Sequence, residues 1–199
     1  MEKAIALLSG GIDSPVAIHR MQKNFEVIAV HCDQRELTGN GEIEKVENLA
    51  KKLGIKKLYC LPFTDVFKEI ADKCNHRDYF ILSKIAMFKA AEEIAKKENS
   101  EILITGENLA QVSSQTLSNM KSIDSQIKFK ILRPLLTWDK QDIINLANEI
   151  GTYDISKGPE ICSLLGPNNP STKSKVVKIE NELTRLDLNK LIKESIAKA

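Results

Sequence analysis

Residues 3–14 read KAIALLSGGIDS, a short apolar run followed by a turn rich in serine and glycine. An apolar run that ends in glycines is typical of a buried strand. Pro15 comes next, where the first turn of a helix tolerates a proline, and Asp13 or Ser14 can cap that helix. The segment therefore predicts a strand, a tight turn and a helix in immediate succession.

The turn Ser9–Ser14 has the features of a phosphate-binding loop. Gly10 and Gly11 allow the backbone to come close to a ligand, and the two serines add hydroxyl donors. Amides at the N-terminus of a helix favour an anion. The loop matches neither GxxxxGK[ST] nor GxGxxG. A connection that binds nothing is the alternative, and the strand–loop–helix context favours phosphate.

Outward from this loop, predicted strands and helices alternate along the whole chain. The strands are expected at residues 3–8, 25–31, 57–61, 101–105 and 130–132. Helices are expected after the loop and at 42–53, 65–74, 79–97, 111–120, 139–150, 170–183 and 187–198, with a loop at 32–41. This alternation predicts an α/β fold, a doubly wound parallel five-stranded sheet with C-terminal helices. Ligands of such folds bind beyond the C-terminal ends of the strands.

Two units are expected within this fold. Residues 1–169 form the nucleotide-binding domain and include the loop that carries Cys162. Residues 170–199 form a helical extension of the same domain.

The charges do not indicate a dedicated nucleic-acid-binding protein. The 199 residues include 29 Lys and Arg against 27 Asp and Glu, so the net charge is only +2. Any contact with a nucleic acid must come from local patches, for which solvated faces are the alternative. The candidate residues are Lys121, Lys128, Lys130, Arg133 and Lys140, and a second group of Lys173, Lys175 and Lys178.

The apolar runs and the cysteines point to a cytoplasmic protein. The longest apolar runs have four or five residues, whereas a membrane-spanning helix needs about 20, so no membrane segment is expected. The four cysteines form no CxxC pair, which excludes a zinc ribbon and favours reduced thiols. They are Cys32, Cys60, Cys74 and Cys162. An Fe–S cluster held by three cysteines from distant loops is a disfavoured alternative.

Several stretches resemble a known family. SGGIDS resembles the PP-loop of the ATP pyrophosphatases, which have a Rossmann-like, adenine nucleotide alpha hydrolase-like fold. ILITGENLAQVSSQTLSNM (102–120), LRPLLTWDKQDIINLANEIGTYDIS (132–156) and PEICSLLGPNNPSTKSKVVKIENEL (159–183) resemble the tRNA 4-thiouridine synthetase family, ThiI. The resemblance runs from about Ile5 to Ile192.

The resemblance implies an enzyme that uses ATP and Mg²⁺ to adenylate O4 of a uridine in tRNA, releasing pyrophosphate. Sulfur transfer then yields 4-thiouridine and AMP, and the family is also linked to thiamine biosynthesis. Asp13 would act in catalysis and hold the metal ion, and Lys140 would lie near the reacting atoms. Cys162 would carry the sulfur as a persulfide.

The resemblance also implies a set of nucleotide contacts. They are Leu7, Leu8, Ser9, Gly10, Gly11, Asp13, Ser14, His31, Cys32, Lys84, Gly106 and Gln115. Simpler interpretations stand beside several of them. Leu7 and Leu8 also suit a core, Lys84 can extend to solvent, and Gln115 can cap a helix.

In the family this module follows an RNA-binding part that contains a THUMP domain, and some members carry a rhodanese-like domain that relays sulfur. The residues here resemble only the PP-loop module. The expected partners are therefore tRNA, a separate THUMP-type RNA-binding protein and a persulfide or sulfide donor, with a homodimer as another way to extend the surface. Two other functions stay open: adenylation of a small metabolite or carrier protein, and ATP binding without turnover.

Overall fold

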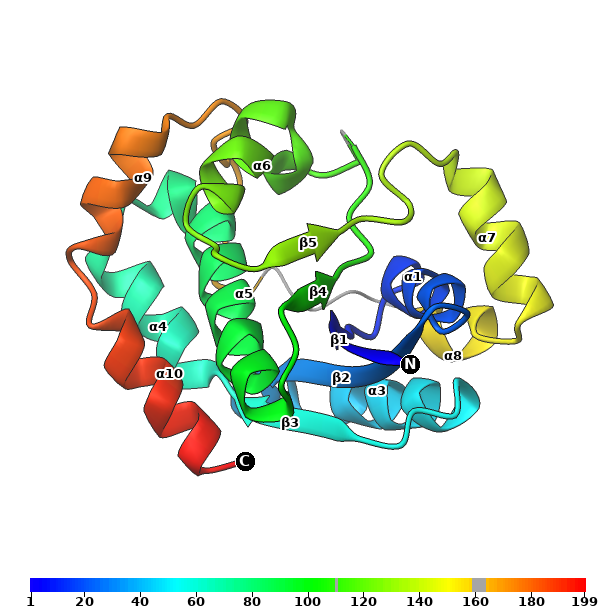
Figure 1. Cartoon of the computed structure of the whole chain (residues 1–199). Coiled ribbons are helices and arrows are strands. Elements are labelled where there is room, and N and C mark those ends of the chain that lie inside the picture. The colour runs from blue at the N-terminus through cyan, green and yellow to red at the C-terminus, as the bar shows by residue number, and fades with distance from the viewer. Residues whose placement is uncertain (110, 159–163) are drawn as a thin grey trace.

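The computed structural model describes residues 1–109, 111–158 and 164–199. Its centre is a five-stranded sheet in the order β3-β2-β1-β4-β5, in which every neighbouring pair is parallel (Figure 1). The strands are β1 (Glu2–Leu7), β2 (Phe25–Asp33), β3 (Leu58–Pro62), β4 (Ile102–Ile104) and β5 (Lys130–Leu132). The predicted doubly wound parallel sheet is confirmed.

Helices cover both faces of the sheet. They are α1 (Asp13–Met21), α2 (Arg35–Thr38), α3 (Gly41–Lys52), α4 (Thr64–Lys73), α5 (Tyr79–Glu98), α6 (Leu117–Asp124), α7 (Lys140–Glu149), α8 (Tyr153–Ser156), α9 (Val176–Leu183) and α10 (Leu188–Ala197), with 3₁₀ turns η1 (His76–Asp78) and η2 (Ser113–Gln115). One buried cluster joins the sheet to α4, α5, α6, α9 and α10, and the other joins it to α1, α3 and α7.

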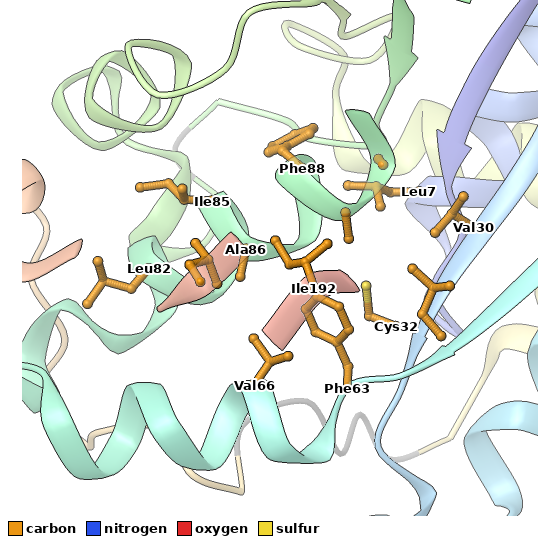
Figure 2. Close-up of a cluster of buried hydrophobic side chains, with 14 of the residues drawn as sticks. Leu7, Val30, Cys32, Phe63, Val66, Leu82, Ile85, Ala86, Phe88 and Ile192 are labelled. Carbon is orange, nitrogen blue, oxygen red and sulfur yellow. The ribbon is translucent and has the colours of Figure 1, made fainter. Parts of the chain in front are cut away.

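The long helix α5 organises the first cluster. Figure 2 shows Leu82, Ile85 and Phe88 of this helix in one buried cluster with Val66 of α4 and with Leu7 and Val30 of the sheet. Ile192 of α10 lies in the same cluster and is 2% exposed. The C-terminal helices therefore share this core, while the division of the chain at residue 170 stays a prediction.

The strand order has its switch point between β1 and β4. From β1 the chain winds outward to β2 and β3, then returns to β4 and β5 on the other side of β1. The helices that follow β1 and β4 lie on opposite faces of the sheet, and in such folds ligands bind beyond the carboxyl ends of the strands at this switch point. The Ser9–Ser14 loop and Gly106 lie at this point, so topology and motif indicate the same site.

Several element boundaries differ from the sequence expectations. Helix α1 begins at Asp13 with Ile12 as its N-cap and no capping side chain, so neither Asp13 nor Ser14 caps it. The region 32–41 is not a plain loop, because β2 continues to Asp33 and α2 follows. In 111–120 only the residues from Leu117 on are α-helical.

The first tail helix also begins later than expected. The predicted helix 170–183 starts only at Val176. Residues 171–174 use their backbone groups in bonds to other segments instead, as described below. Within the parts of the chain described, no helix is both long and apolar enough to cross a membrane.

Candidate active site

The loop after β1 is held together by its two serines. Ser14 Oγ accepts from the Ser9 amide at 3.0 Å and lies 3.1 Å from Ser9 Oγ, and Ser9 Oγ accepts from the Gly11 amide at 3.3 Å. The first amides of a helix have no acceptor within the helix, and α1 has no capping side chain. The loop therefore offers a preformed turn and a helix N-terminus to an anion.

Asp13 and Lys140 meet at the mouth of this loop. Lys140 Nζ lies 2.5 Å from Asp13 Oδ1 and 3.4 Å from Gln111 Oε1. Asp139 caps α7 by accepting from the Gln141 amide, as predicted, and this cap fixes where Lys140 begins the helix. Two residues that were predicted to be catalytic, 127 positions apart, are thus brought into contact.

The carboxyl end of β2 supplies buried groups beside the loop. His31 is 3% exposed and its Nδ1 lies 3.0 Å from the carbonyl oxygen of Leu8, while Nε2 has no partner among the described residues. Burial lowers the pKa of His31, which favours the neutral imidazole. Leu7 and Leu8 are core residues, and their backbones border the loop.

Cys32 behaves as a core residue. Its sulfur points into the apolar cluster near Phe63 and Ile192 (Figure 2). Burial raises the pKa of its thiol far above the usual range, so the sulfur stays protonated. Only the backbone of Cys32 remains available for the predicted nucleotide contact.

A buried ion network lies at the carboxyl end of β4. Glu107 is fully buried, and its two oxygens lie 3.3 Å from Lys84 Nζ and 2.8 Å from Arg133 Nε. Burial acts to raise the pKa of Glu107, but the two cations outweigh it, so this pKa lies below its usual value. Arg133 also contacts Asp124 and is only 11% exposed, so it does not belong to the predicted solvent-facing basic patch.

Sequence reasoning missed Glu107. A carboxylate between glycine and asparagine in a polar loop gives no signal of burial, and its partners come from α5 and from the residue after β5. The network fixes the ammonium of Lys84 at the carboxyl edge of the sheet. A contact between Lys84 and ATP stays a prediction.

We expect Glu107→Gln to lower the free energy of unfolding by about 3 kcal/mol, because it leaves two cations without their buried countercharge. Urea unfolding measures this change. The control is Glu93→Gln, which breaks an exposed i,i+3 pair with Lys96 and should change stability by less than about 0.5 kcal/mol. Equal effects of the two substitutions would contradict the buried network.

Gly106 lets β4 end directly against the first turn of α1. A Cβ at this position would lie 2.6 Å from the Ser14 amide nitrogen and 2.7 Å from the Asp13 carbonyl carbon. Both are backbone atoms that cannot move aside cheaply. The structure thus assigns Gly106 a packing role, and its predicted approach to a nucleotide stays a prediction.

Gly106→Ala should lower the free energy of unfolding by about 2 kcal/mol, because the new methyl group overpacks α1 against β4. Gly41→Ala is the matched control, since nothing lies within 4 Å of a Cβ there and alanine favours the helix. Thermal unfolding compares them. A Gly106→Ala protein as stable as the Gly41→Ala protein would refute this close approach.

Gln115 does not cap a helix. Thr116 caps α6 by accepting from the Asn119 amide, while Gln115 is 8% exposed and its Oε1 is buried without a partner among the described residues. Buried polar groups normally have a partner. The unpaired acceptor is therefore a candidate ligand contact.

Two described segments flank the stretch that contains Cys162, which itself lies outside the described residues. Ser156 Oγ donates to the carbonyl oxygen of Gly11 at 3.2 Å, which fastens the preceding segment to the SGGIDS loop. The alkyl chain of Lys45 runs beside Gly10, and its Nζ is close to Gly158. Lys45 is a further cation at the loop that sequence reasoning missed.

The described cysteines show no sign of a reactive thiol or of a cluster. Burial raises the pKa of Cys74 to about 11 and also raises the pKa of Cys60. Among residues 1–109, 111–158 and 164–199, no three or more His, Cys, Asp or Glu side chains are grouped so as to hold a metal ion.

Comparisons with known proteins place the chain in a family. The family described as Thiamine biosynthesis protein (ThiI) matches residues 1–188. The chain belongs to the ThiI family. A ThiI relative from Moorella thermoacetica, named probable tRNA sulfurtransferase, is 37% identical over 98% of this chain. One from Caldanaerobacter subterraneus, with the same name, is 41% identical over 96%. The chain spans about half the length of these curated relatives, 52% of each.

A solved structure shows the same arrangement. The crystal structure of a 4-thiouridine synthetase–RNA complex with bound ATP is 34% identical, with a TM-score of 0.92 over 98% of this chain and 53% of that one. NMN synthetase from Francisella tularensis, at 15% identity and a TM-score of 0.61, shares the fold; the alignment covers 99% of this chain and 84% of that one. The ThiI resemblance inferred from SGGIDS and the 102–120 segment is therefore confirmed.

Proposed function

We propose that this chain is the catalytic module of an ATP-dependent tRNA sulfurtransferase that forms 4-thiouridine. The observation that carries the proposal is the contact of Asp13 with Lys140 at the mouth of the SGGIDS loop. A carboxylate and an ammonium at a helix N-terminus suit the transfer of AMP and the departure of pyrophosphate. The choice of ATP as nucleotide, of RNA as substrate and of sulfur as the transferred atom rests on the names of the relatives.

The loop Ser9–Ser14 and the N-terminus of α1 would hold the phosphates of ATP. Lys45 and Lys140 lie beside this loop and would offset the charge of the leaving pyrophosphate. Asp13 fits Mg²⁺, because that ion usually takes one or two protein carboxylates together with phosphate oxygens and water. When bound, Mg²⁺ would neutralise phosphate charge during adenylation.

The nucleoside of ATP would lie beyond the carboxyl ends of the strands, at the switch point between β1 and β4. The backbones of Leu7, Leu8, His31 and Cys32 would contact it there. Two buried acceptors lack partners among the described residues, His31 Nε2 and Gln115 Oε1. Each can accept from a ribose hydroxyl or from the amino group of adenine.

Cys162 is proposed to deliver the sulfur. Burial raises the pKa of each of the other three thiols, which makes them poor nucleophiles. Ser156 is tied to Gly11, and the six residues from Ser156 to Cys162 span at most about 20 Å, which is an upper limit on the distance that Cys162 would have to cover in this proposal. The outer sulfur of a Cys162 persulfide would attack C4 of the adenylated uridine as AMP leaves, and a thiol reductant would then cleave the remaining S–S bond.

Loading and RNA delivery would need partners. A persulfide donor, or sulfide itself, would supply the sulfur atom. We propose that a THUMP-type module in a separate protein presents the tRNA, with a homodimer as the other way to enlarge the RNA-binding surface. These reactions take place in the cytoplasm in this proposal.

The test is the formation of 4-thiouridine in unmodified tRNA, measured by mass spectrometry of the digested nucleosides. The reaction contains ATP, Mg²⁺ and a persulfide donor, with and without a THUMP-domain protein. The proposal predicts ATP-dependent 4-thiouridine in at least one of these mixtures. ATP cleavage that is stimulated by a small carbonyl compound and not by tRNA would instead favour the hypothesis that the enzyme adenylates a small metabolite.

A further inference from the structure

An open polar pocket lies where η1 meets the segment that leads into α9. Its volume is about 320 Å³, at the small end of the range for ligand pockets. Every side chain that lines it is polar, and half of them are cationic. They are Asn75, Arg77, Ser171, Thr172, Lys173 and Lys178.

The positive charges of this pocket are only partly neutralised. Lys178 Nζ lies 2.5 Å from Oδ2 of Asp78, whose side chain is fully buried. Among the residues that the structure describes, Arg77 Nε donates to the carbonyl oxygen of Asn169 alone, at 3.3 Å. Neither Arg77 nor Lys173 has a carboxylate partner among the described residues. Like charges held side by side repel, and an anion between them removes this cost.

The wall of the pocket is preformed. Asn119 is fully buried and binds three backbone groups: its Nδ2 donates to the carbonyl oxygens of Ser113 at 2.6 Å and Ser171 at 2.8 Å, and its Oδ1 accepts from the Ser174 amide at 2.9 Å. The Ser171 amide donates to the Arg77 carbonyl oxygen at 2.7 Å. Binding of a ligand therefore costs little entropy for ordering the segment 171–174.

The pocket lies at the same edge of the sheet as the candidate active site. Helix α5 leads into β4, so in a parallel sheet its N-terminus lies at the carboxyl ends of the strands (Figure 1). Lys84, six residues after Asp78 and so about 9 Å along the helix axis, contacts Glu107 beyond the end of β4. A long polyanion can reach both sites.

We propose that this pocket binds a phosphate group in the backbone of the RNA substrate. Arg, Lys, Ser, Thr and Asn side chains are the usual protein donors to nucleic-acid phosphates. Because the net charge of the chain is only +2, such local groups must supply its electrostatic attraction for RNA. The inference rests on the proposed function, which makes RNA the substrate. Free inorganic phosphate shares this chemistry and is the competing occupant.

The test measures the affinity of the chain for unmodified tRNA, without ATP, as a function of salt. Arg77→Gln combined with Lys173→Gln should weaken binding about tenfold and lower the salt slope by about two. Lys190→Gln combined with Lys193→Gln, at two exposed lysines of α10, is the charge-matched control and should bind like the wild type. Circular dichroism melting verifies that each variant is folded.

Unchanged tRNA affinity in the double variant, or no measurable affinity of the wild type for tRNA, would overturn the inference. Loss of inorganic phosphate binding with unchanged tRNA affinity would assign the pocket to a free anion and overturn it too. The proposed function fails differently, by a wild type that cleaves no ATP to AMP. Wild-type affinity of the double variant for ATP would show that the two sites are separate.

Discussion

Asp13→Asn should reduce AMP formation from ATP at least about 100-fold without unfolding the protein. The substitution keeps the shape of the side chain but removes the negative charge that lies beside Lys140 at the SGGIDS loop. The Asp13–Lys140 pair is part-exposed, with side-chain exposures of 25% and 46%, so its loss costs at most about 1 kcal/mol of stability. The release of labelled AMP measures the loss of activity, and urea unfolding measures the change in stability.

Asp154→Asn is the matched control for this prediction. Asp154 also lies in the first turn of a helix and pairs with a lysine, Lys157, at 2.7 Å, but it is 82% exposed. This variant should form AMP at the wild-type rate. An Asp13→Asn protein with at least half of the wild-type rate would remove Asp13 from the catalytic machinery.

Cys162→Ser should abolish persulfide-dependent formation of 4-thiouridine while AMP formation continues. Serine cannot carry a persulfide, whereas the ATP site contains no part of this side chain in the proposal. High concentrations of free sulfide should restore some thiolation, since sulfide can attack the adenylated uridine without a carrier. Quantifying AMP and 4-thiouridine in the same reaction shows whether adenylation continues while sulfur transfer is lost.

Cys60→Ser controls for the removal of a thiol. Cys60 is half-buried in β3, and burial raises the pKa of its thiol, so this variant should thiolate tRNA normally. Persulfide-dependent thiolation by Cys162→Ser at the wild-type rate would contradict the role of Cys162. Parallel loss of AMP and 4-thiouridine would instead place this residue in adenylation.

Local sequence patterns predict the architecture well because each of the long strands is a short apolar run with clear ends. The apolar runs around Ile5 and Ile28 end at glycine or polar residues, and period and length suffice to identify them as buried strands. The site loop follows from the same logic, since Gly10 and Gly11 come directly after the first strand. Parallel topology then brings the other loops to that edge.

Long-range polar contacts account for most of what the sequence did not predict. The family resemblance implied separate roles for Asp13 and Lys140, but their contact was not predicted, because no local pattern joins residues 127 positions apart. Glu107 and Asn119 are buried by partners from distant segments. Asn119 also explains why 170–183 is not one helix, since it binds the backbone of 171–174.

The most direct test of the account uses ATP labelled at the α-phosphate, with Mg²⁺, and resolves AMP from ADP with and without unmodified tRNA. A PP-loop site that adenylates uridine should release AMP and pyrophosphate, and tRNA should increase the rate. Release of ADP would contradict cleavage between the α and β phosphates. It would remove the chemical basis assigned to Asp13, Lys140 and the SGGIDS loop.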